Sequence, residues 1–375
     1  MNGLKDKSME NRLAALRKLY QENEKIVPTD AVNNHVHTWY SFSPYSPSEA
    51  IWKAYNAGLS IVGIMDHDSA AGTSEFIQAG EIVGITVTNG VECRVSMAGT
   101  ALAEKSINNP DQRGVAYAAM HAIPRSKIKE AQEFFEVVRQ RRGLRNRRMM
   151  EKINECLAPI DIVLDYDEDV LPLSQADEGG SVTERHLLYA IALKIIDKFP
   201  TGNELISALK KLEVNVSEEL ASEENPYRAY DLLGKLKTGL IDKFYIRATD
   251  ELVPCAEFTA FANRIGAIPA YAYLGDVEQS VTGDKRPQSF EDSYLDLLFD
   301  EIKRLGFKAV TYMPSRNTLE QITRLRELCA KHDLIQISGE DINSPRQNFI
   351  CEKLADPEYK DLTESAWMLT KHELC

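Results

Sequence analysis

Histidines and acidic residues follow several apolar runs of this sequence, and they are the side chains with the clearest chemistry. His35 and His37 lie two residues apart at the end of a predicted strand, which points both imidazoles to one face. Only seven histidines occur in 375 residues, and four of them follow an apolar run. Further residues of metal-ligand type follow other runs, namely Asp66-His67, Glu92, His121 and Asp341. The sequence therefore predicts a metal site, and imidazole with carboxylate favours Mn, Fe or Zn over Mg or Ca.

The hydrophobic pattern predicts the elements that must position these side chains. Buried strands are expected at 59–65, 82–88, 115–120, 267–273, 309–312 and 334–338. Helices are expected at 8–24, 47–57, 73–80, 126–157, 289–305 and 317–332. Ligand-type residues after alternating strands are typical of a parallel α/β barrel, whose reacting groups gather at the C-terminal strand ends. Residues 166–260 are acidic and mostly helical in pattern, which indicates an insertion.

Composition limits the class of protein. The hydrophobic fraction of 43% and charged fraction of 27% are ordinary for a soluble globular chain. No apolar run approaches the ~20 residues of a membrane span, and no membrane partner is expected. The net charge of −13 argues against extended nucleic acid as a partner, but it allows a local basic pocket. Six cysteines without CxxC spacing and no export signal favour reduced thiols and a cytoplasmic localisation.

With these motifs in place, the chain resembles the PHP (polymerase and histidinol phosphatase) family of metal-dependent phosphoesterases. The residues that carry the resemblance are His35-Val36-His37-Thr38, Gly63 to Asp68, Gly90-Val91-Glu92, His121, Glu184-Arg185-His186 and Gly339 to Asn343. The resemblance implies an α/β fold, a distorted (β/α)7 TIM-like barrel with a helical insertion subdomain. We expect an N-terminal helix in 1–26, the barrel in 27–165 and 261–350, the insertion in 166–260, and a C-terminal tail in 351–375.

The resemblance also implies up to three metals, for which this chain has an incomplete set of ligands. The first would take His35, His37, Glu92 and Asp341, and all four are present. The second would add His121 and a histidine where the chain has Tyr273, and the third would use the Asp66-His67 element and ligands where the chain has Phe42 and Asn343. We therefore expect one to two divalent transition metals (Mn, Fe or Zn). The expected ligands are His35, His37, His67, Glu92, His121 and Asp341.

Several of these residues keep a second interpretation. Asp66 and His67 either act at the site or form a hydrogen-bonded pair that supports it. Tyr273 either donates a hydrogen bond to a bound anion or packs in the barrel core. Asn343 either holds a water or the substrate, or stabilises a turn.

Arginine is the natural ligand for a phosphate group because its planar guanidinium binds two oxygens. The expected substrate-binding residues are Arg94, Arg185, Arg316 and Asn343. The expected catalytic residues are Asp66, His67, Arg185, His186, Tyr273 and Arg316. Six arginines fall between Arg139 and Arg148, on a predicted helix. They form either a solvated face paired with the acidic insertion, or a phosphate or oligomer contact.

These features predict a phosphoesterase that hydrolyses a small phosphorylated metabolite or nucleotide by means of metal-activated water. Two alternatives stay open. One is a mononuclear hydrolase of C–N or carboxylic ester bonds on the same scaffold. The other is a non-catalytic homologue that binds a metal or metabolite. A small phosphorylated substrate is the expected partner, and homo-oligomerisation is left open.

Overall fold

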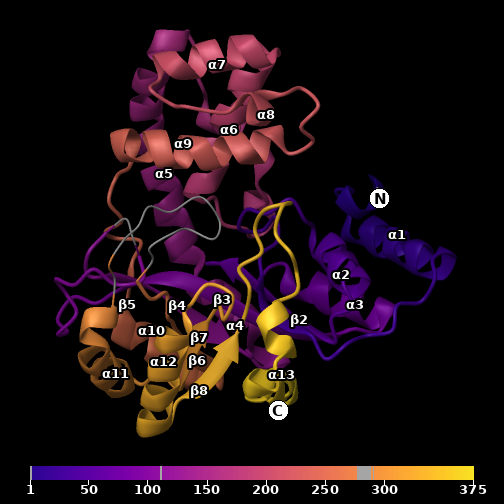
Figure 1. Ribbon diagram of the computed structural model, residues 1–375, viewed down its shortest axis with the longest axis vertical. Coiled ribbons are helices and arrows are strands. Elements are labelled where there is room, and N and C mark those ends of the chain that lie inside the picture. Colours follow the sequence, from indigo (N-terminus) through magenta and orange to yellow (C-terminus); the bar gives the residue numbers. More distant parts are fainter. Residues whose placement is uncertain (1, 110–111, 277–288, 290) are drawn as a thin grey trace.

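A barrel of strands carries the candidate site, and a helical unit stands over one end of it (Figure 1). The computed structural model describes residues 2–109, 112–276, 289 and 291–375. The strands are β1 (Val32–Val36), β2 (Ile61–His67), β3 (Thr86–Ser96), β4 (Val115–His121), β5 (Val253–Pro254), β6 (Ile268–Ala272), β7 (Ala309–Tyr312) and β8 (Ile335–Ser338). Seven of them follow the order β1-β2-β3-β4-β6-β7-β8, and β5 pairs with β3. A bridge between Val36 and Ile342 brings the end of β1 to the chain after β8, so the sheet is nearly closed. The predicted barrel fold is confirmed.

Strand β4 departs from the parallel barrel that the pattern predicted. It is antiparallel to both β3 and β6, while the other neighbours along the barrel are parallel. The connection from β3 to β4 contains no helix in its described residues, and it starts with a hydrogen bond from Met97 N to Gly114 O. A parallel return would need a crossover, usually a helix. The chain therefore turns back directly, and β4 ends at the opposite end of the barrel from β3.

Helices cover the outside of the barrel. They are α1 (Met9–Glu22), α2 (Pro47–Asn56), α3 (Thr73–Val83), α4 (Ile128–Phe134), α5 (Glu136–Leu157), α10 (Cys255–Ile265), α11 (Leu295–Arg304), α12 (Leu319–His332) and α13 (Lys360–His372). The side chain of Ser46 accepts a hydrogen bond from Glu49 N at 3.0 Å, and Pro47 starts α2, so the sequence fixes where this helix begins. The predicted strand at 82–88 overlaps the end of α3, and β3 starts only at Thr86. No described helix has the length and apolar character that a membrane crossing requires.

The helical unit consists of α6 (Glu184–Lys198), α7 (Gly202–Lys211), α8 (Glu218–Ala221) and α9 (Arg228–Phe244), which share one apolar cluster with the C-terminal half of α5 (Figure 1). Its buried apolar cluster includes Met149 and Ile153 of α5 as well as the four helices. Val253 and Cys255 already belong to the apolar cluster of the barrel. The apolar core of this unit therefore begins within α5 and ends before β5.

The C-terminal segment closes the other end of the barrel. Residues 351–375, expected as a tail, contain α13, which lies below the strands (Figure 1). Leu369 of α13 is fully buried in a cluster with Met65, Ala119 and Ile337 from three strands. This packing leaves the opposite end, below the helical unit, as the open end of the barrel.

Candidate metal centre

The two histidines of the first motif meet Glu92 at the open end of the barrel. His35 lies on β1 and His37 follows it, and Glu92 lies on β3. His35 Nε2 is 3.3 Å from His37 Nε2 and 3.6 Å from Glu92 Oε2. One ligand atom from each of these buried residues lies within 4.8 Å of the others. The period of a strand therefore presents both imidazoles to the same acid, as the sequence indicated.

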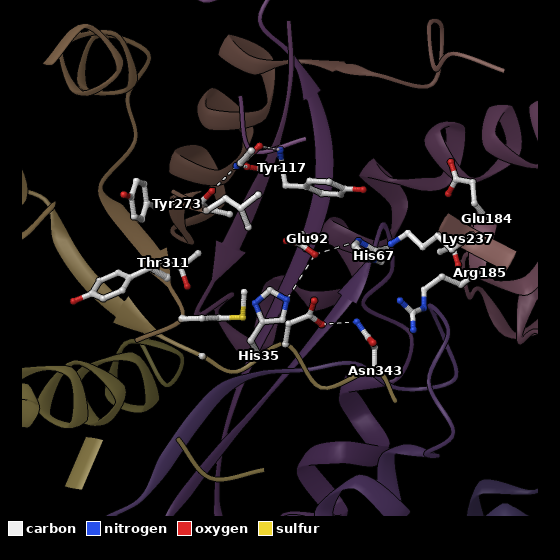
Figure 2. A pocket seen from close by; sticks show the side chains of 18 of the residues that line it. His35, His67, Glu92, Tyr117, Glu184, Arg185, Lys237, Tyr273, Thr311 and Asn343 are labelled. Carbon is white, nitrogen blue, oxygen red and sulfur yellow. Dashed lines mark hydrogen bonds and ion pairs between the residues drawn. The ribbon is translucent and has the colours of Figure 1, made fainter. Parts of the chain in front are cut away.

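Two more side chains approach the same group. Asp341, just after β8, places Oδ1 at 3.2 Å from His37 Nε2. His67, at the end of β2, places Nδ1 at 3.3 Å from Glu92 Oε2. Figure 2 shows His35 and His67 on either side of Glu92. Four separate segments of the barrel thus contribute to one cluster of three imidazoles and two carboxylates.

The donor set fits a divalent transition metal. The two imidazole nitrogens lie 3.3 Å apart, and they lie 3.6 and 4.0 Å from the Glu92 carboxylate, so a shared cation can accept the lone pairs of all three. Burial lowers the pKa of His67 to about 3, which keeps its imidazole neutral at pH 7. Burial alone would raise the pKa of Glu92, but the imidazoles of His35, His67 and His37 hold it at about 2. Burial opposes a charge on His35, but the Glu92 carboxylate raises the pKa of this imidazole overall. Since neutral imidazoles and ionised carboxylates are the forms that bind metal, a metal would compete with a proton for His35.

Asp66 supports this cluster from behind. It accepts hydrogen bonds from Thr38 N at 2.7 Å, from Thr38 Oγ1 at 2.6 Å and from Ser41 Oγ at 2.6 Å. Ser41 Oγ in turn lies 3.3 Å from Nδ1 of His37. The buried carboxylate is not among the residues that line the cavity. Of the two interpretations of Asp66, the structure favours the supporting one, which corrects its expected catalytic placement. A supporting hydrogen bond to the second nitrogen of a metal-binding histidine orients the ring.

His121 does not join the cluster. The antiparallel direction of β4 pairs it with Gly90 of β3 and Ile268 of β6, and Ala119 is the residue that lies opposite Glu92. Its ring is buried, and no described group hydrogen-bonds to its Nε2 atom. The expectation that β4 is parallel is therefore wrong. Burial lowers the pKa of His121 to about 3, and the nearby His35 and Glu92 also affect this pKa, so His121 lies below the cluster rather than within it.

The three positions where the resemblance implied further ligands make other contacts in the structure. The ring of Phe42 belongs to the apolar cluster of the helical unit and meets the His186 ring edge-on at 5.0 Å. Tyr273 lines the cavity, but its hydroxyl donates to Asp292 at 2.6 Å. Asn343 Nδ2 donates to Asp341 Oδ1 at 2.7 Å, so this amide orients the carboxylate of Asp341.

Two residues expected to act on the substrate lie outside the cavity. Arg94 is buried, and its guanidinium contacts Glu251 at 2.5 Å and Glu184 at 3.1 Å. His186 is buried at the start of α6, where its Nδ1 accepts a hydrogen bond from Thr183 N at 3.0 Å and completes the helix cap. These contacts correct the expected phosphate-binding role of Arg94 and the catalytic role of His186, because neither side chain lines the cavity.

The cavity over the cluster is lined by His35, His67, Glu92 and Asp341 from the barrel, and by Arg185, Lys237 and Tyr245 from or beside the helical unit. Figure 2 shows Lys237 and Arg185 on the side of His67. Arg185 was expected there, while Arg316 lines a larger neighbouring cavity. The sequence analysis did not predict three further residues that line the cavity, namely Lys237, Tyr117 and Arg142. Arg142 belongs to the arginine-rich run, but no local pattern singles out Lys237 or Tyr117.

Comparisons with known proteins agree with this geometry. Residues 33–147 match the PHP domain, so the predicted resemblance is confirmed. A 5'-3' exoribonuclease of Haemophilus influenzae is 27% identical over 152 residues, which is 40% of this chain and 47% of the relative. The match therefore spans about half the length of that curated relative.

Two solved structures share the fold. One is a protein of Bifidobacterium adolescentis, whose assignment as a metal-dependent phosphoesterase is provisional. It has a TM-score of 0.57 and 21% identity, and the match covers 88% of this chain and 96% of the other. The second is an amidohydrolase of Chromobacterium violaceum with bound sulfate and no metal, with a TM-score of 0.55, 16% identity, and coverage of 90% and 96%. The PHP domain and the His/Glu cluster together support a metal-dependent hydrolase.

Proposed function

We propose that this protein hydrolyses the phosphoester of a small phosphorylated metabolite or nucleotide. The observation that carries the proposal is that a metal-type donor cluster and the cationic side chains Arg185 and Lys237 line one cavity. Carboxylates and imidazoles alone would repel or ignore an anion, whereas guanidinium and ammonium groups beside them attract one.

The residues around the cavity have three different roles in this proposal. His35, His37, Glu92 and Asp341 would hold the metal, with His67 beside Glu92. A divalent transition metal bound there supplies a Lewis acid and lowers the pKa of a bound water to about 7. Arg185 and Lys237 stabilise the negative charge of the phosphoryl oxygens. Asp66, through Ser41, and Asn343, through Asp341, are positioning residues that orient the ligands.

A second candidate is hydrolysis of a C–N or carboxylic ester bond with a single metal. It is supported by the use that the chain makes of Phe42 and Tyr273, whose side chains turn to the helical unit and to Asp292 rather than to the metal cluster. With one metal, a phosphoester loses the clamp on the attacking and leaving oxygens that two metals provide.

The deciding experiment measures metal content and turnover together. Protein purified without chelator is analysed for Mn, Fe and Zn per chain, and phosphate release is followed from a panel of phosphomonoesters. We expect metal-dependent release that Glu92→Gln abolishes and that Lys308→Gln, a change remote from the cavity, leaves unchanged. Turnover of amides or lactones without phosphate release would select the second candidate, and ligand binding without any turnover would select a binding protein.

A further inference from the structure

Two cavities of different size meet at the metal centre. The one lined by the metal cluster has a volume of about 180 Å³, and the neighbouring one has a volume of about 840 Å³. They share Arg185, Met313, Asp341 and Asn343. Sites for small organic ligands usually measure roughly 300–1,000 Å³. The first cavity therefore holds a group of phosphate size, and the larger cavity has room for the remainder of a substrate.

The larger cavity is a groove between the helical unit and the segment 340–353. Figure 1 shows the chain between β8 and α13 rising toward α8 and α9. Arg346 of this segment binds Asp231 of α9 through two bonds of 2.7 Å, from Nε to Oδ1 and from Nη2 to Oδ2. A bidentate pair of this kind has a defined geometry, and it connects the two walls at one place.

The lining of the groove exposes more apolar than polar surface, and its charged side chains are balanced. Five basic side chains, among them Lys235 and Arg316, stand against five acidic ones, among them Glu219 and Glu340. Hydroxyl and amide side chains such as Ser217, Gln347 and Asn348 make up much of the remainder. Balanced charge does not favour a polyanion, whereas amides and hydroxyls offer both donors and acceptors to the hydroxyl groups of a sugar.

Gly234 leaves one wall of the groove bare. It lies in the interior of α9, where glycine is less favourable than alanine. A Cβ atom built there meets no described heavy atom within 4 Å, although the residue lines the groove. Gly239 on the same helix has a packing reason, since its Cβ would lie 2.9 Å from Val214. At Gly234 the space that a side chain would fill is the groove itself.

We infer that this groove binds the non-reacting part of the substrate, and that this part is a hydroxyl-rich group of the sugar class. The inference rests on the proposed function for the identity of the reacting group, a phosphoester placed at the metal centre. Gly234 determines the size of the accepted group because it keeps the wall of α9 open.

The test fills the groove without touching the metal centre. Ribose 5-phosphate and methyl phosphate are the probes, and their dissociation constants are measured by calorimetry on metal-loaded protein. Wild type is expected to bind ribose 5-phosphate about tenfold more tightly than methyl phosphate. Gly234→Trp should remove this preference and leave methyl phosphate binding within about twofold. Gly234→Ala is the matched control, which should keep the preference and raise the melting temperature.

The outcomes separate the two proposals. If Gly234→Trp binds both probes as wild type does, or if wild type does not distinguish them, the groove inference is overturned. If the preference is present and is lost in Gly234→Trp, but no ester releases phosphate, the groove inference stands and the proposed hydrolysis fails. Should Gly234→Trp not fold, Asn348→Trp on the opposite wall fills the same groove and decides in the same way.

Discussion

Two clusters in this molecule bring charged groups together below the surface, and they compensate these charges in different ways. At the open end of the barrel, the metal cluster gathers three imidazoles and two carboxylates. Between α5, β3 and the helical unit, the arginine cluster gathers Arg94, Arg142 and Arg145 around Asp68, Glu184 and Glu251. In the second cluster every carboxylate has a guanidinium within 2.6 Å. A buried charge needs a partner, and in the first cluster the partner that we propose is a metal ion.

The difference assigns a separate task to each cluster. Arg145 binds Glu184 at the start of α6 and also binds Glu251 just before β5, both at 2.5 Å. These bonds join the helical unit to the barrel and hold the start of α6, which carries Arg185, over the cavity. The arginine cluster is therefore a brace, whereas the metal cluster is a site. Changes in one should affect stability, and changes in the other should affect metal binding and turnover.

The largest expected effect follows removal of an acid from the metal cluster. Glu92→Gln takes away the carboxylate that lies near His35, His37 and His67, so metal affinity falls and the rate constant kcat/KM should drop by about 10³-fold or more. Elemental analysis and phosphate release measure the two effects. Full activity with one metal fewer per chain would contradict the assignment of Glu92.

The second-largest effect is expected when the arginine cluster is changed, and it is an effect on stability. Glu251→Gln removes one of the two carboxylates that Arg94 and Arg145 share and leaves them Glu184, and breaking a buried ion pair costs about 3–5 kcal/mol of unfolding free energy. Urea unfolding of the metal-free protein measures it, and metal content per folded chain should not change. A variant that unfolds like wild type but loses its metal would show that the two clusters are not separate.

The metal cluster was largely predictable from the sequence, and the brace was not. His35, His37, His67 and Glu92 each stand at or near the end of an apolar run, so a local pattern and the rule for parallel strands place them together. The brace joins residues more than 100 positions apart, such as Arg145 and Glu251. Arg141, Arg145 and Arg148 fall on one predicted helix face, yet Arg145 is buried and the other two are exposed. Only tertiary contacts decide which arginine turns inward.

The direction of a strand is the second feature that the sequence did not predict. The run from Val115 to His121 has the apolar character of a buried strand, and this character is the same in parallel and antiparallel pairs. The direction depends on the connection before it, where no helix forms among the described residues. The direction of β4 was therefore predicted wrongly, although the strand itself was predicted.

A third buried carboxylate, which belongs to neither the metal cluster nor the arginine cluster, extends the comparison. Glu373, after α13, is buried and accepts a hydrogen bond from Asn89 N at 2.7 Å. Burial raises its pKa to about 8, against the opposing effects of Asn89 and Arg125. Because the folded-state pKa is raised, the folded chain holds a proton that the unfolded chain loses near pH 4.5. Stability should fall between about pH 4.5 and 8, by on the order of a few kcal/mol.

Glu373→Gln replaces the protonated acid by a neutral amide and should remove this dependence. Urea unfolding of wild type and variant at pH 5, 6, 7 and 8 gives the two slopes. Equal slopes in the two proteins would mean that Glu373 ionises in the folded state as freely as in the unfolded one.

The smallest effect is expected at an exposed arginine of the same helix as the brace. Arg147 forms two bonds with Asp167, at 2.5 and 2.7 Å, but 45% of its side chain and 57% of that of Asp167 are exposed. An exposed ion pair contributes about 0–1 kcal/mol because water and salt screen it. Arg147→Gln should therefore shift the unfolding free energy by less than about 1 kcal/mol, and the shift should shrink further in 1 M salt. If Arg147→Gln destabilised the protein as much as Glu251→Gln does, burial would not be what distinguishes the brace from the remaining arginines of α5.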